Sequence, residues 1–382
     1  MAYSRFRGII DTLTMGVGFN AGQSPDMIHI SGNIYAVVYQ DGVGIPPGRV
    51  ETFSIDANGI FSAVIDTLVF DAVRAESPTI SHVSGDTYAI VYTGPDLDGW
   101  LVTISIDTNG NIGGAILDSL EFDAVQGTMA DILHLSGDFF VIIYAGPDTD
   151  GWLATVEIDA AGNITAPITD SWEFDAGWGR RPHIIHIAGT IYAFTYEKFG
   201  GAGQLTTIAI ADNGVIGAVV DTYQFSADSA PTRMLHIAGD VYAIAWIGGG
   251  GAQVLTIEID IAGNITVPPI DTRTMDDLAE DSWEVDFIHF GDDIYIIAYV
   301  GDRNLNDRGW VASMSISLAG ALALIDRFEY ETPFNVEMLS MLPVSSAIIT
   351  VASYVPSDCV VKTISLLVDP SVQTLPATGI TK

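Results

Sequence analysis

The feature that most constrains this chain is a unit of about 50 residues that recurs six times. The segment MIHISGNIYAVVY begins the first unit, and ISHVSGDTYAIVY, ILHLSGDFFVIIY and IIHIAGTIYAFTY begin the next three. The histidines shared by the units are His29, His82, His134, His186, His236 and His289, spaced 53, 52, 52, 50 and 53 residues apart. Such a period predicts one repeat architecture rather than several independent domains.

Each unit contains four short runs that are typical of β-strands. In residues 80–124, runs rich in Ile, Val, Thr and Tyr are separated by SGD, GPDLDG and DTNGN. The Asn-Gly and Gly-Asn pairs provide the positive φ angles that tight hairpins need. The fourth runs share an aspartate, namely Asp66, Asp118, Asp170, Asp221, Asp271 and Asp326. We therefore expect an all-β protein built from four-stranded units.

The two ends of the chain complete a seventh unit. Residues 334–369 contain three strand-like runs without a fourth, and residues 8–15 match the fourth-run pattern. Asp11 lies 55 residues before Asp66, one repeat earlier. An outer strand supplied by the start of the chain would close a ring and leave no open seam.

In unit length, strand count and ring closure, residues 8–369 resemble seven-bladed β-propellers, without matching a named family. The expected blades are 25–73, 78–124, 130–176, 182–227, 231–277, 286–331, and 334–369 together with 8–15. The His-x-x-Gly-Asp element resembles the Gly-His of Trp-Asp repeats, but no unit ends in Trp-Asp. The third-to-fourth turns also lack the Asp-x-Asp-x-Asp-Gly of integrin-type calcium loops.

Residues 370–382 are expected to form an extended tail or linker. They contain LPATG, which matches the sortase pattern, but only Ile380, Thr381 and Lys382 follow. A cell-wall sorting signal continues into an apolar segment and a basic end, so a sorting signal and a linker or docking arm both stay open, and we favour the latter. The start of the chain lacks the apolar core of a signal peptide.

Composition excludes several classes of partner. The chain has 48 Asp and Glu but 14 Lys and Arg, a formal charge of −34, which argues against nucleic-acid binding and against adhesion to anionic lipid. Its apolar runs have the length of strands, so we expect a soluble protein without membrane insertion. The single Cys359 rules out an internal disulfide framework and is expected to be a buried structural thiol.

The repeat histidines suggest metal binding or catalysis at first sight. A catalytic group is not needed six times around a ring, so we expect each imidazole to satisfy a buried backbone or neighbouring-blade partner. The outer-strand aspartates are expected to accept hydrogen bonds from turns or neighbouring blades for the same reason. His183, in RRPHIIH, stands outside the repeat pattern and is the histidine to test for chemistry.

The loops between second and third strands offer candidate sites. GPDLDGW and GPDTDGW place two carboxylates one residue apart, at Asp96 and Asp98, and at Asp148 and Asp150. Such pairs can contribute oxygens to Ca²⁺, although two fall short of the six to eight that it takes, and an ordinary Asp-Gly turn is the favoured interpretation. The tryptophans Trp100, Trp152 and Trp310 close these loops and either stack on a sugar or pack between blades.

The most distinctive loop is DAGWGRRP, which joins two blades. Its Trp178, Arg180 and Arg181 stand out in a chain so poor in cations. Together they suit a carboxylate, an acidic sugar or the acidic patch of a partner, while salt bridges to acidic neighbours are the alternative.

The sequence favours a non-enzymatic structural or interaction module of a surface, extracellular or virion-associated protein, with no cofactor. Protein partners, self-assembly or an adjoining domain beyond the tail would bind its loops. A glycan-binding propeller using the tryptophan loops is one alternative. A hydrolase or lyase with its site at the propeller mouth, near His183, Arg180 and Arg181, is the other.

Overall fold

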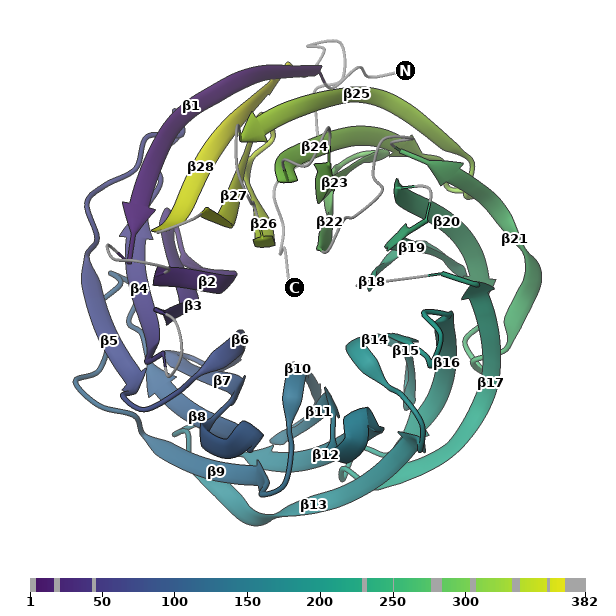
Figure 1. The fold of residues 1–382 in the computed structure, drawn as a ribbon, viewed down its shortest axis with the longest axis horizontal. Coiled ribbons are helices and arrows are strands. Elements are labelled where there is room, and N and C mark those ends of the chain that lie inside the picture. The colour runs from purple at the N-terminus through teal and green to yellow at the C-terminus, as the bar shows by residue number, and fades with distance from the viewer. Residues whose placement is uncertain are drawn as a thin grey trace.

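The computed structural model describes residues 5–16, 21–42, 46–228, 232–249, 251–275, 284–302, 307–331, 337–355 and 358–367. These residues form seven four-stranded antiparallel sheets arranged as blades around a central axis (Figure 1). The predicted all-β, seven-bladed propeller is therefore confirmed. The predicted tail, residues 370–382, lies outside the described residues.

The strands are numbered along the chain, and within each blade they run from the axis outward. Blade 1 contains β2 (Ala21–Ser31), β3 (Ile34–Asp41), β4 (Gly48–Ser54) and β5 (Asp66–Asp71). Blade 2 contains β6 (Glu76–Ser84), β7 (Thr87–Thr93), β8 (Gly99–Ser105) and β9 (Asp118–Asp123). Blade 3 contains β10 (Thr128–Ser136), β11 (Phe139–Ala145), β12 (Gly151–Ile158) and β13 (Ile164–Asp175). Blade 4 contains β14 (Arg180–Ala188), β15 (Ile191–Glu197), β16 (Gly203–Ile210) and β17 (Ile216–Ser226).

The remaining three blades follow the same order. Blade 5 contains β18 (Thr232–Ala238), β19 (Val241–Gly248), β20 (Gly251–Ile259) and β21 (Ile265–Thr274). Blade 6 contains β22 (Val285–Gly291), β23 (Ile294–Asp302), β24 (Asp307–Ile316) and β25 (Leu322–Glu331). Blade 7 contains β26 (Glu337–Ser345), β27 (Ile348–Val355), β28 (Asp358–Leu367) and, as its outer strand, β1 (Arg5–Met15).

The hydrophobic core lies between blades rather than inside a single layer. Middle strands are apolar on both faces, and β7 is buried along its whole length, whereas the outer β5 alternates between half-buried and exposed residues. One cluster joins Val38 and Val50 of blade 1 to Ile90 and Ile104 of blade 2. Each such buried side chain contributes about 1.5–3 kcal/mol, so neighbouring blades stabilise one another.

Two circles of polar contacts connect successive blades. In the outer circle, Oδ2 of each outer-strand aspartate accepts a backbone N–H from the next blade. The pairs are Asp11–Phe61, Asp66–Ile112, Asp118–Ile164, Asp170–Ile216, Asp221–Ile265, Asp271–Leu322 and Asp326–Phe6. In the second circle, a third-strand threonine donates to a glycine carbonyl in the next blade's hairpin. The pairs are Thr52–Gly110, Thr103–Gly162, Thr155–Gly214, Thr207–Gly263, Thr256–Gly320 and Thr363–Gly59. The outer aspartates thus have the neighbouring-blade role expected from the sequence.

The amino-terminal strand closes the ring. β1 pairs antiparallel with β28 from Arg5↔Leu367 to Met15↔Cys359. The strand also makes the same contacts with its two neighbouring blades as the other outer strands do. Asp326 of blade 6 accepts from Phe6 N at 3.0 Å, and Asp11 accepts from Phe61 N of blade 1 at 3.0 Å. Cys359 is free and buried beside this joint, as predicted.

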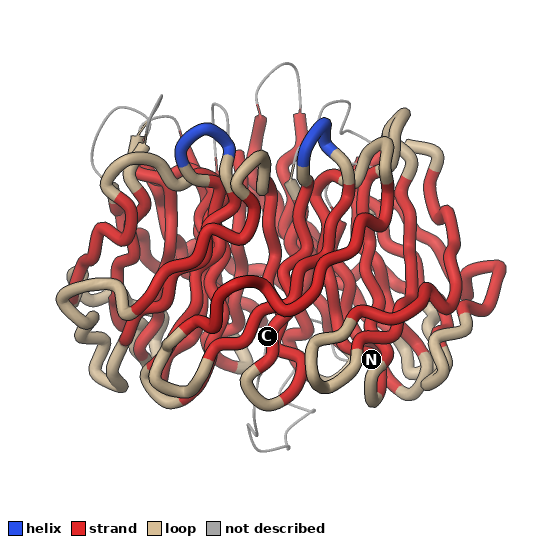
Figure 2. The backbone as a smooth tube through the Cα atoms, turned by 90° about the horizontal axis from the view of Figure 1, so that it is seen from below, coloured by secondary structure: helices blue, strands red, loops and turns tan. Residues whose placement is uncertain are grey.

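The two faces of the ring carry different loops. The second-to-third loops and the blade connections lie on one side, here called the connection face, together with the short 3₁₀ turns η1 (Pro95–Leu97) and η2 (Pro147–Thr149) (Figure 2). The other side, the hairpin face, carries the first-to-second and third-to-fourth turns. Within the described residues, no helix is long and apolar enough to cross a membrane.

The repeat histidines have a local structural role on the hairpin face. Each Nε2 lies 2.8–3.0 Å from the carbonyl oxygen three residues later, as His82 does with Gly85 and His289 with Asp292. Each ring also packs on the aromatic residue at the second position of the second strand, as His82 does on Tyr88. The imidazoles are exposed rather than buried, because they brace the turn of their own hairpin and not the neighbouring blade.

Candidate functional site

The connection face of blade 4 differs from the same face of blades 2 and 3. Its second-to-third loop reads EKFGGAG, where blades 2 and 3 have TGPDLDG and AGPDTDG. Lys198 N donates to Ala202 O at 2.7 Å, and Gly201 N donates to Lys198 O at 3.0 Å, which makes a tight turn. Gly200 and Gly201 both have a φ of +85°, a conformation that favours glycine. The turn lifts Phe199 into solvent, where 78% of it is exposed.

The loop from β13 to β14 brings Trp178 against Phe199. Asp175 Oδ1 accepts from the backbone N–H of Gly177 at 3.0 Å and of Trp178 at 3.2 Å, so one carboxylate shapes the connection. The Trp178 and Phe199 rings meet edge to face, with centroids 5.8 Å apart. Arg180 Cζ lies 5.2 Å from the centroid of the Trp178 ring, within cation–π range.

Two further cations complete this surface. Arg181 donates from Nη1 to Glu197 Oε2 at 3.2 Å, and Lys198 Nζ lies 3.8 Å from Asp175 Oδ2. We call Trp178, Arg180, Arg181, Lys198 and Phe199 the blade-4 patch. It holds three of the 14 cationic residues of the chain. Arg181 therefore forms a salt bridge, which was the alternative interpretation from the sequence. Arg180 instead lies over the ring of Trp178.

The tryptophans of the other loops pack inward. Trp100 contacts the core between blades 1 and 2, Trp152 the core between blades 2 and 3, and Trp310 the core between blades 5 and 6. Nε1 of Trp100 and of Trp152 is buried without a hydrogen-bond partner. The half-buried indoles therefore contribute to blade packing, and sugar stacking on them stays a prediction.

Backbone hydrogen bonds close the acidic loops of blades 2 and 3, from Gly94 N to Asp98 O and from Gly146 N to Asp150 O. Asp96 and Asp148 adopt φ of +58° and +57° inside η1 and η2. Burial and the nearby Asp98 raise the pKa of Glu121, while burial and the charge of Asp148 raise the pKa of Asp150. Among the described residues no three acidic, histidine or cysteine side chains gather as a metal site, and calcium binding by Asp96, Asp98, Asp148 and Asp150 stays a prediction.

A belt of polar side chains lines the central channel near the start of the innermost strands. It takes one residue from each blade, always three positions before the repeat histidine or its equivalent: Asp26, Thr79, Asp131, His183, Arg233, Asp286 and Ser340. In blades 1 to 4 a residue with φ of +47° to +54° stands two positions earlier, beside a register shift. Such a bulge re-aims the next side chains, here toward the channel.

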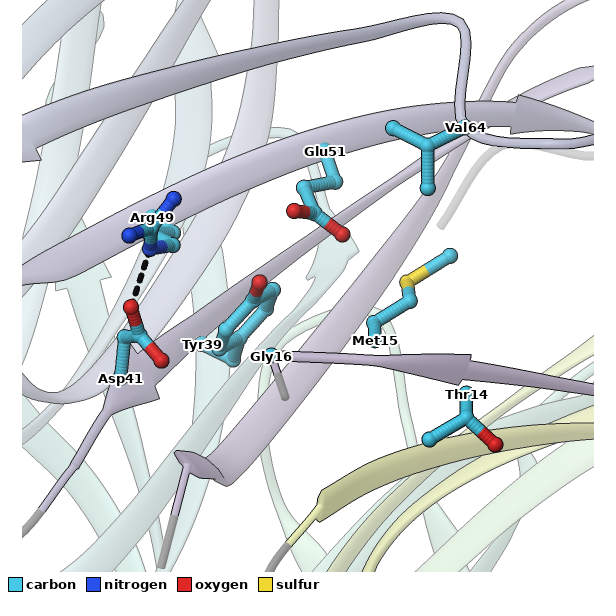
Figure 3. Close-up of a pocket in the computed structure, with 8 residues that line it drawn as sticks. All are labelled: Thr14, Met15, Gly16, Tyr39, Asp41, Arg49, Glu51 and Val64. Atoms are coloured by element: carbon cyan, nitrogen blue, oxygen red, sulfur yellow. Dashed lines mark hydrogen bonds and ion pairs between the residues drawn. The ribbon is translucent and has the colours of Figure 1, made fainter. Parts of the chain in front are cut away.

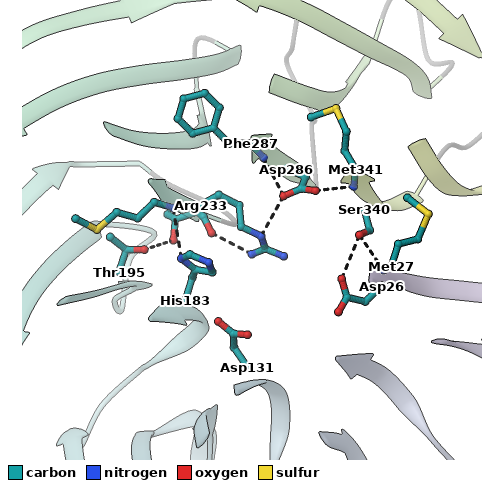
Figure 4. A network of polar contacts seen from close by, with 12 residues as sticks. Asp26, Met27, Asp131, His183, Thr195, Arg233, Asp286, Phe287, Ser340 and Met341 are labelled. Carbon is teal, nitrogen blue, oxygen red and sulfur yellow. Dashed lines mark hydrogen bonds and ion pairs between the residues drawn. The ribbon is translucent and has the colours of Figure 1, made fainter. Parts of the chain in front are cut away.

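The belt joins blades at the axis as the aspartates do at the rim. Asp286 Oδ2 accepts from Met341 N at 2.7 Å, and His183 Nδ1 accepts from Met234 N at 3.4 Å (Figure 4). Ser340 Oγ lies 3.1 Å from both Met27 N and Asp26 Oδ1. In this contact the imidazole of His183 uses Nδ1 as the acceptor.

Charge in the belt centres on Arg233. Its guanidinium lies 3.7 Å from Asp286 Oδ1, and 34% of its side chain remains exposed to the channel. Burial raises the pKa of Asp131 to about 6, although Arg233 acts in the opposite direction. Because the belt contains this carboxyl with a raised pKa as well as His183, it is the place where the hydrolase or lyase alternative would be tested.

Sequence reasoning grouped Trp178, Arg180, Arg181 and His183 as one candidate site, but the structure divides them between two places. The first three lie together on the connection face, whereas His183 belongs to the belt. Phe199 was missed, although an aromatic residue in a Gly-rich loop is a usable signal. The belt was missed because its residue types differ from blade to blade, and only a column aligned on the repeat histidine shows that the position is always polar.

No family model and no curated protein matches this chain. Solved structures do match its fold. A lectin from Burkholderia pseudomallei is 13% identical with a TM-score of 0.62, covering 92% of this chain and 96% of its own. The periplasmic gluconolactonase of Pseudomonas aeruginosa is 16% identical with a TM-score of 0.57, covering 88% and 98%. Sqt1 of Chaetomium thermophilum is 12% identical with a TM-score of 0.54, covering 93% and 100%. At these identities the likeness concerns the fold alone.

Proposed function

We propose that this propeller is a non-enzymatic binding module that holds a protein partner through the blade-4 patch. The observation that carries the proposal is Phe199, which is 78% exposed yet packed edge to face on Trp178, with Arg180 stacked on the same indole. Tryptophan and arginine are the residues most enriched among those that dominate binding energy. Exposed aromatic rings beside a cation suit a partner that presents an apolar side chain next to a carboxylate.

The negative charge of the neighbouring loops limits which protein partners can bind the blade-4 patch. The loops of blades 2 and 3 carry Asp96, Asp98, Asp148 and Asp150 on the same face, and the whole chain has a formal charge of −34. An extended acidic segment would be repelled by these loops, whereas an isolated carboxylate meets only the local cations. We place such a module on a cell surface, outside the cell or on a virion, in keeping with the sequence-based expectation.

The test is selection from a displayed library of random peptides against the immobilised protein. Enriched peptides should share an apolar side chain next to Asp, Glu or a terminal carboxylate. Phe199→Ser and Arg180→Ala should each weaken their binding at least tenfold. Val125→Ser is the matched control, because Val125 is 68% exposed in the equivalent connection of blade 2 and lies outside the patch. Peptides that bind Phe199→Ser as tightly as the wild type would refute the proposal.

A glycan is the second candidate, favoured by the same pairing of aromatic rings with cations. Phe199 would stack on a sugar face while Arg180 contacts its carboxylate. The matching fold of a lectin is compatible with this candidate. An array that includes sialylated and uronic-acid glycans tests it. Acidic sugars should bind, neutral ones should not, and Phe199→Ser should abolish the signal while Val125→Ser keeps it.

A further inference from the structure

The outer edge of blade 4 has no partner strand. The sheet order is β14-β15-β16-β17, so β17 pairs with β16 on one side only (Figure 1). In the first half of this 11-residue strand, Val219 and Val220 are 38% and 39% exposed. An unpaired edge offers backbone N–H and C=O groups to a further strand. Each blade ends in such an edge, and the blades differ in how it is protected.

The other long outer strands contain residues that hinder the addition of a strand. Proline removes a backbone donor and a charged side chain disfavours an apolar neighbour, and native edge strands use both. Among the described outer strands of ten or more residues, β17 has no proline, and its one charged residue is Asp221. The protecting residues of the others are Arg5 and Arg7 in β1, Pro167 and Glu173 in β13, Pro268, Pro269 and Arg273 in β21, and Arg327, Glu329 and Glu331 in β25.

The carboxylate of Asp221 leaves most of the edge of β17 uncovered, because the blade uses both of its oxygens. Oδ2 accepts from Ile265 N of blade 5 at 2.9 Å, and Oδ1 accepts from Thr222 N at 2.8 Å. Thr222 N therefore faces away from β16. Outward groups alternate along an antiparallel strand, and the register from Thr222 to Gln224 is regular. Gln224, which is exposed, thus presents its N–H and C=O at the free edge.

The outer strand of blade 1 is the nearest competitor, since β5 also lacks proline, lysine, arginine and glutamate. It has only six residues and would form fewer backbone pairs. Its exposed Val69 has Arg49 as register partner, and Arg49 forms an ion pair with Asp41 (Figure 3). The register partner of Val219 is Ile208. The edge of blade 4 is therefore both longer and less polar.

Carboxylates lie beyond both ends of this free edge. Asp212 is exposed in the turn before β17, and Asp228 is exposed two residues after it. If two copies of the chain paired through antiparallel β17 strands, Asp212 of one copy would lie near Asp228 of the other, and the like charges would repel. The formal charge of −34 opposes such a dimer as well. The charges suit a different segment, one with basic residues at both ends.

We propose that blade 4 binds an extended segment of a partner protein as a fifth strand beside β17. The middle of the segment is uncharged and rich in residues that favour strands, and Lys or Arg at its ends meet Asp212 and Asp228. Backbone hydrogen bonds to the edge provide the affinity of such strand addition. This surface is distinct from the blade-4 patch, so the inference does not depend on the proposed function.

Fluorescence anisotropy with the full chain tests the proposal. The probe is a labelled peptide of three Thr-Val repeats between terminal lysines, and one peptide should bind per ring. Gln224→Pro should weaken binding at least tenfold, because it removes an outward N–H without disturbing the pairing with β16. Val69→Pro, the equivalent change in blade 1, should leave binding within about twofold of the wild type. Circular dichroism confirms that each variant is folded.

A second pair of variants keeps the test valid if proline disturbs the fold. Val219→Lys places a cation on the edge and should weaken binding at least tenfold, whereas Val64→Lys makes the same charge change at the equivalent position of blade 1 and should have little effect. The proposal is overturned if the peptide does not bind, if several bind per ring, or if a folded Gln224→Pro or Val219→Lys protein binds it as tightly as the wild type. Complete loss of binding in about 0.5 M salt, which screens exposed charges, would also overturn it.

Discussion

The contacts of the outer aspartates allow ring closure to be tested by two single substitutions. Asp118 lies at an internal joint, where its Oδ2 accepts from Ile164 N at 2.8 Å. Asp11 lies at the seam, where its Oδ2 accepts from Phe61 N at 3.0 Å. In both residues Oδ1 accepts from the next backbone N–H along the strand. We predict that Asp11→Ala and Asp118→Ala destabilise the protein equally.

The magnitude follows from one inter-blade hydrogen bond to a charged group, worth about 1.5–3 kcal/mol. The bond of Asp118 to the following residue is exposed and adds little, but the truncation also leaves a half-buried N–H unpaired. We therefore expect a loss of about 2–3 kcal/mol for each variant. Asparagine retains one acceptor oxygen, so Asp11→Asn and Asp118→Asn should cost about half as much.

Equilibrium unfolding in urea measures these values, followed by both tryptophan fluorescence and far-ultraviolet circular dichroism. Coincident transitions of the two probes show that a single free energy of unfolding is defined. If Asp118→Ala loses the predicted stability and Asp11→Ala loses less than about 0.5 kcal/mol, within the range of an ordinary surface change, the seam is not held like the other joints. If neither variant loses stability, the reasoning about the aspartate circle is wrong.

Two further predictions concern single positions. Because Arg233 lowers the pKa that burial raises to about 6 in Asp131, Arg233→Gln should move the carboxyl titration midpoint above 6, as followed by ¹³C NMR. The pKa of Asp131 in the folded protein lies above its ordinary value of 3.8. The contribution of this carboxyl to stability is therefore complete below pH 3.8 and is lost as the pH rises through 6. Asp131→Asn should remove this pH dependence from the free energy of unfolding measured in urea. Gly162 has a φ of +88° and its added Cβ would lie 2.7 Å from Leu117 Cδ1, whereas Gly137 has a φ of +58° and open space. Both alanine variants should lose about 1–2 kcal/mol from the left-handed backbone, and Gly162→Ala more, by thermal melting.

The repeat allowed the fold to be predicted because every blade uses the same residue types at the same positions to form its strands and turns. The aspartate of the fourth strand and the Asn-Gly turns recur at fixed offsets, so pattern alone located the strands and the closing strand at residues 8–15. The same repetition correctly identified the repeat histidines as structural. It could not show that they are exposed, because their partner is the turn carbonyl of their own hairpin.

The candidate sites were harder to predict because they depend on departures from the repeat. The belt takes a different residue type from almost every blade, and only a column aligned on the repeat histidine shows that its position is always polar. The proximity of Phe199 to Trp178 requires two residues that are 21 positions apart, in two different loops, to meet. A linear pattern contains no information on that distance.

The two circles of inter-blade contacts have a consequence for the evolution of such a chain. Aspartate Oδ2 and threonine Oγ1 bind backbone N–H and C=O groups of the next blade, and every blade presents those groups whatever its side chains are. A duplicated or transplanted blade would therefore meet its neighbour without matched substitutions, provided that the apolar faces fit. Blades can therefore be exchanged or duplicated, and their loops can diversify in sequence, while the aspartate and threonine contacts between blades are kept.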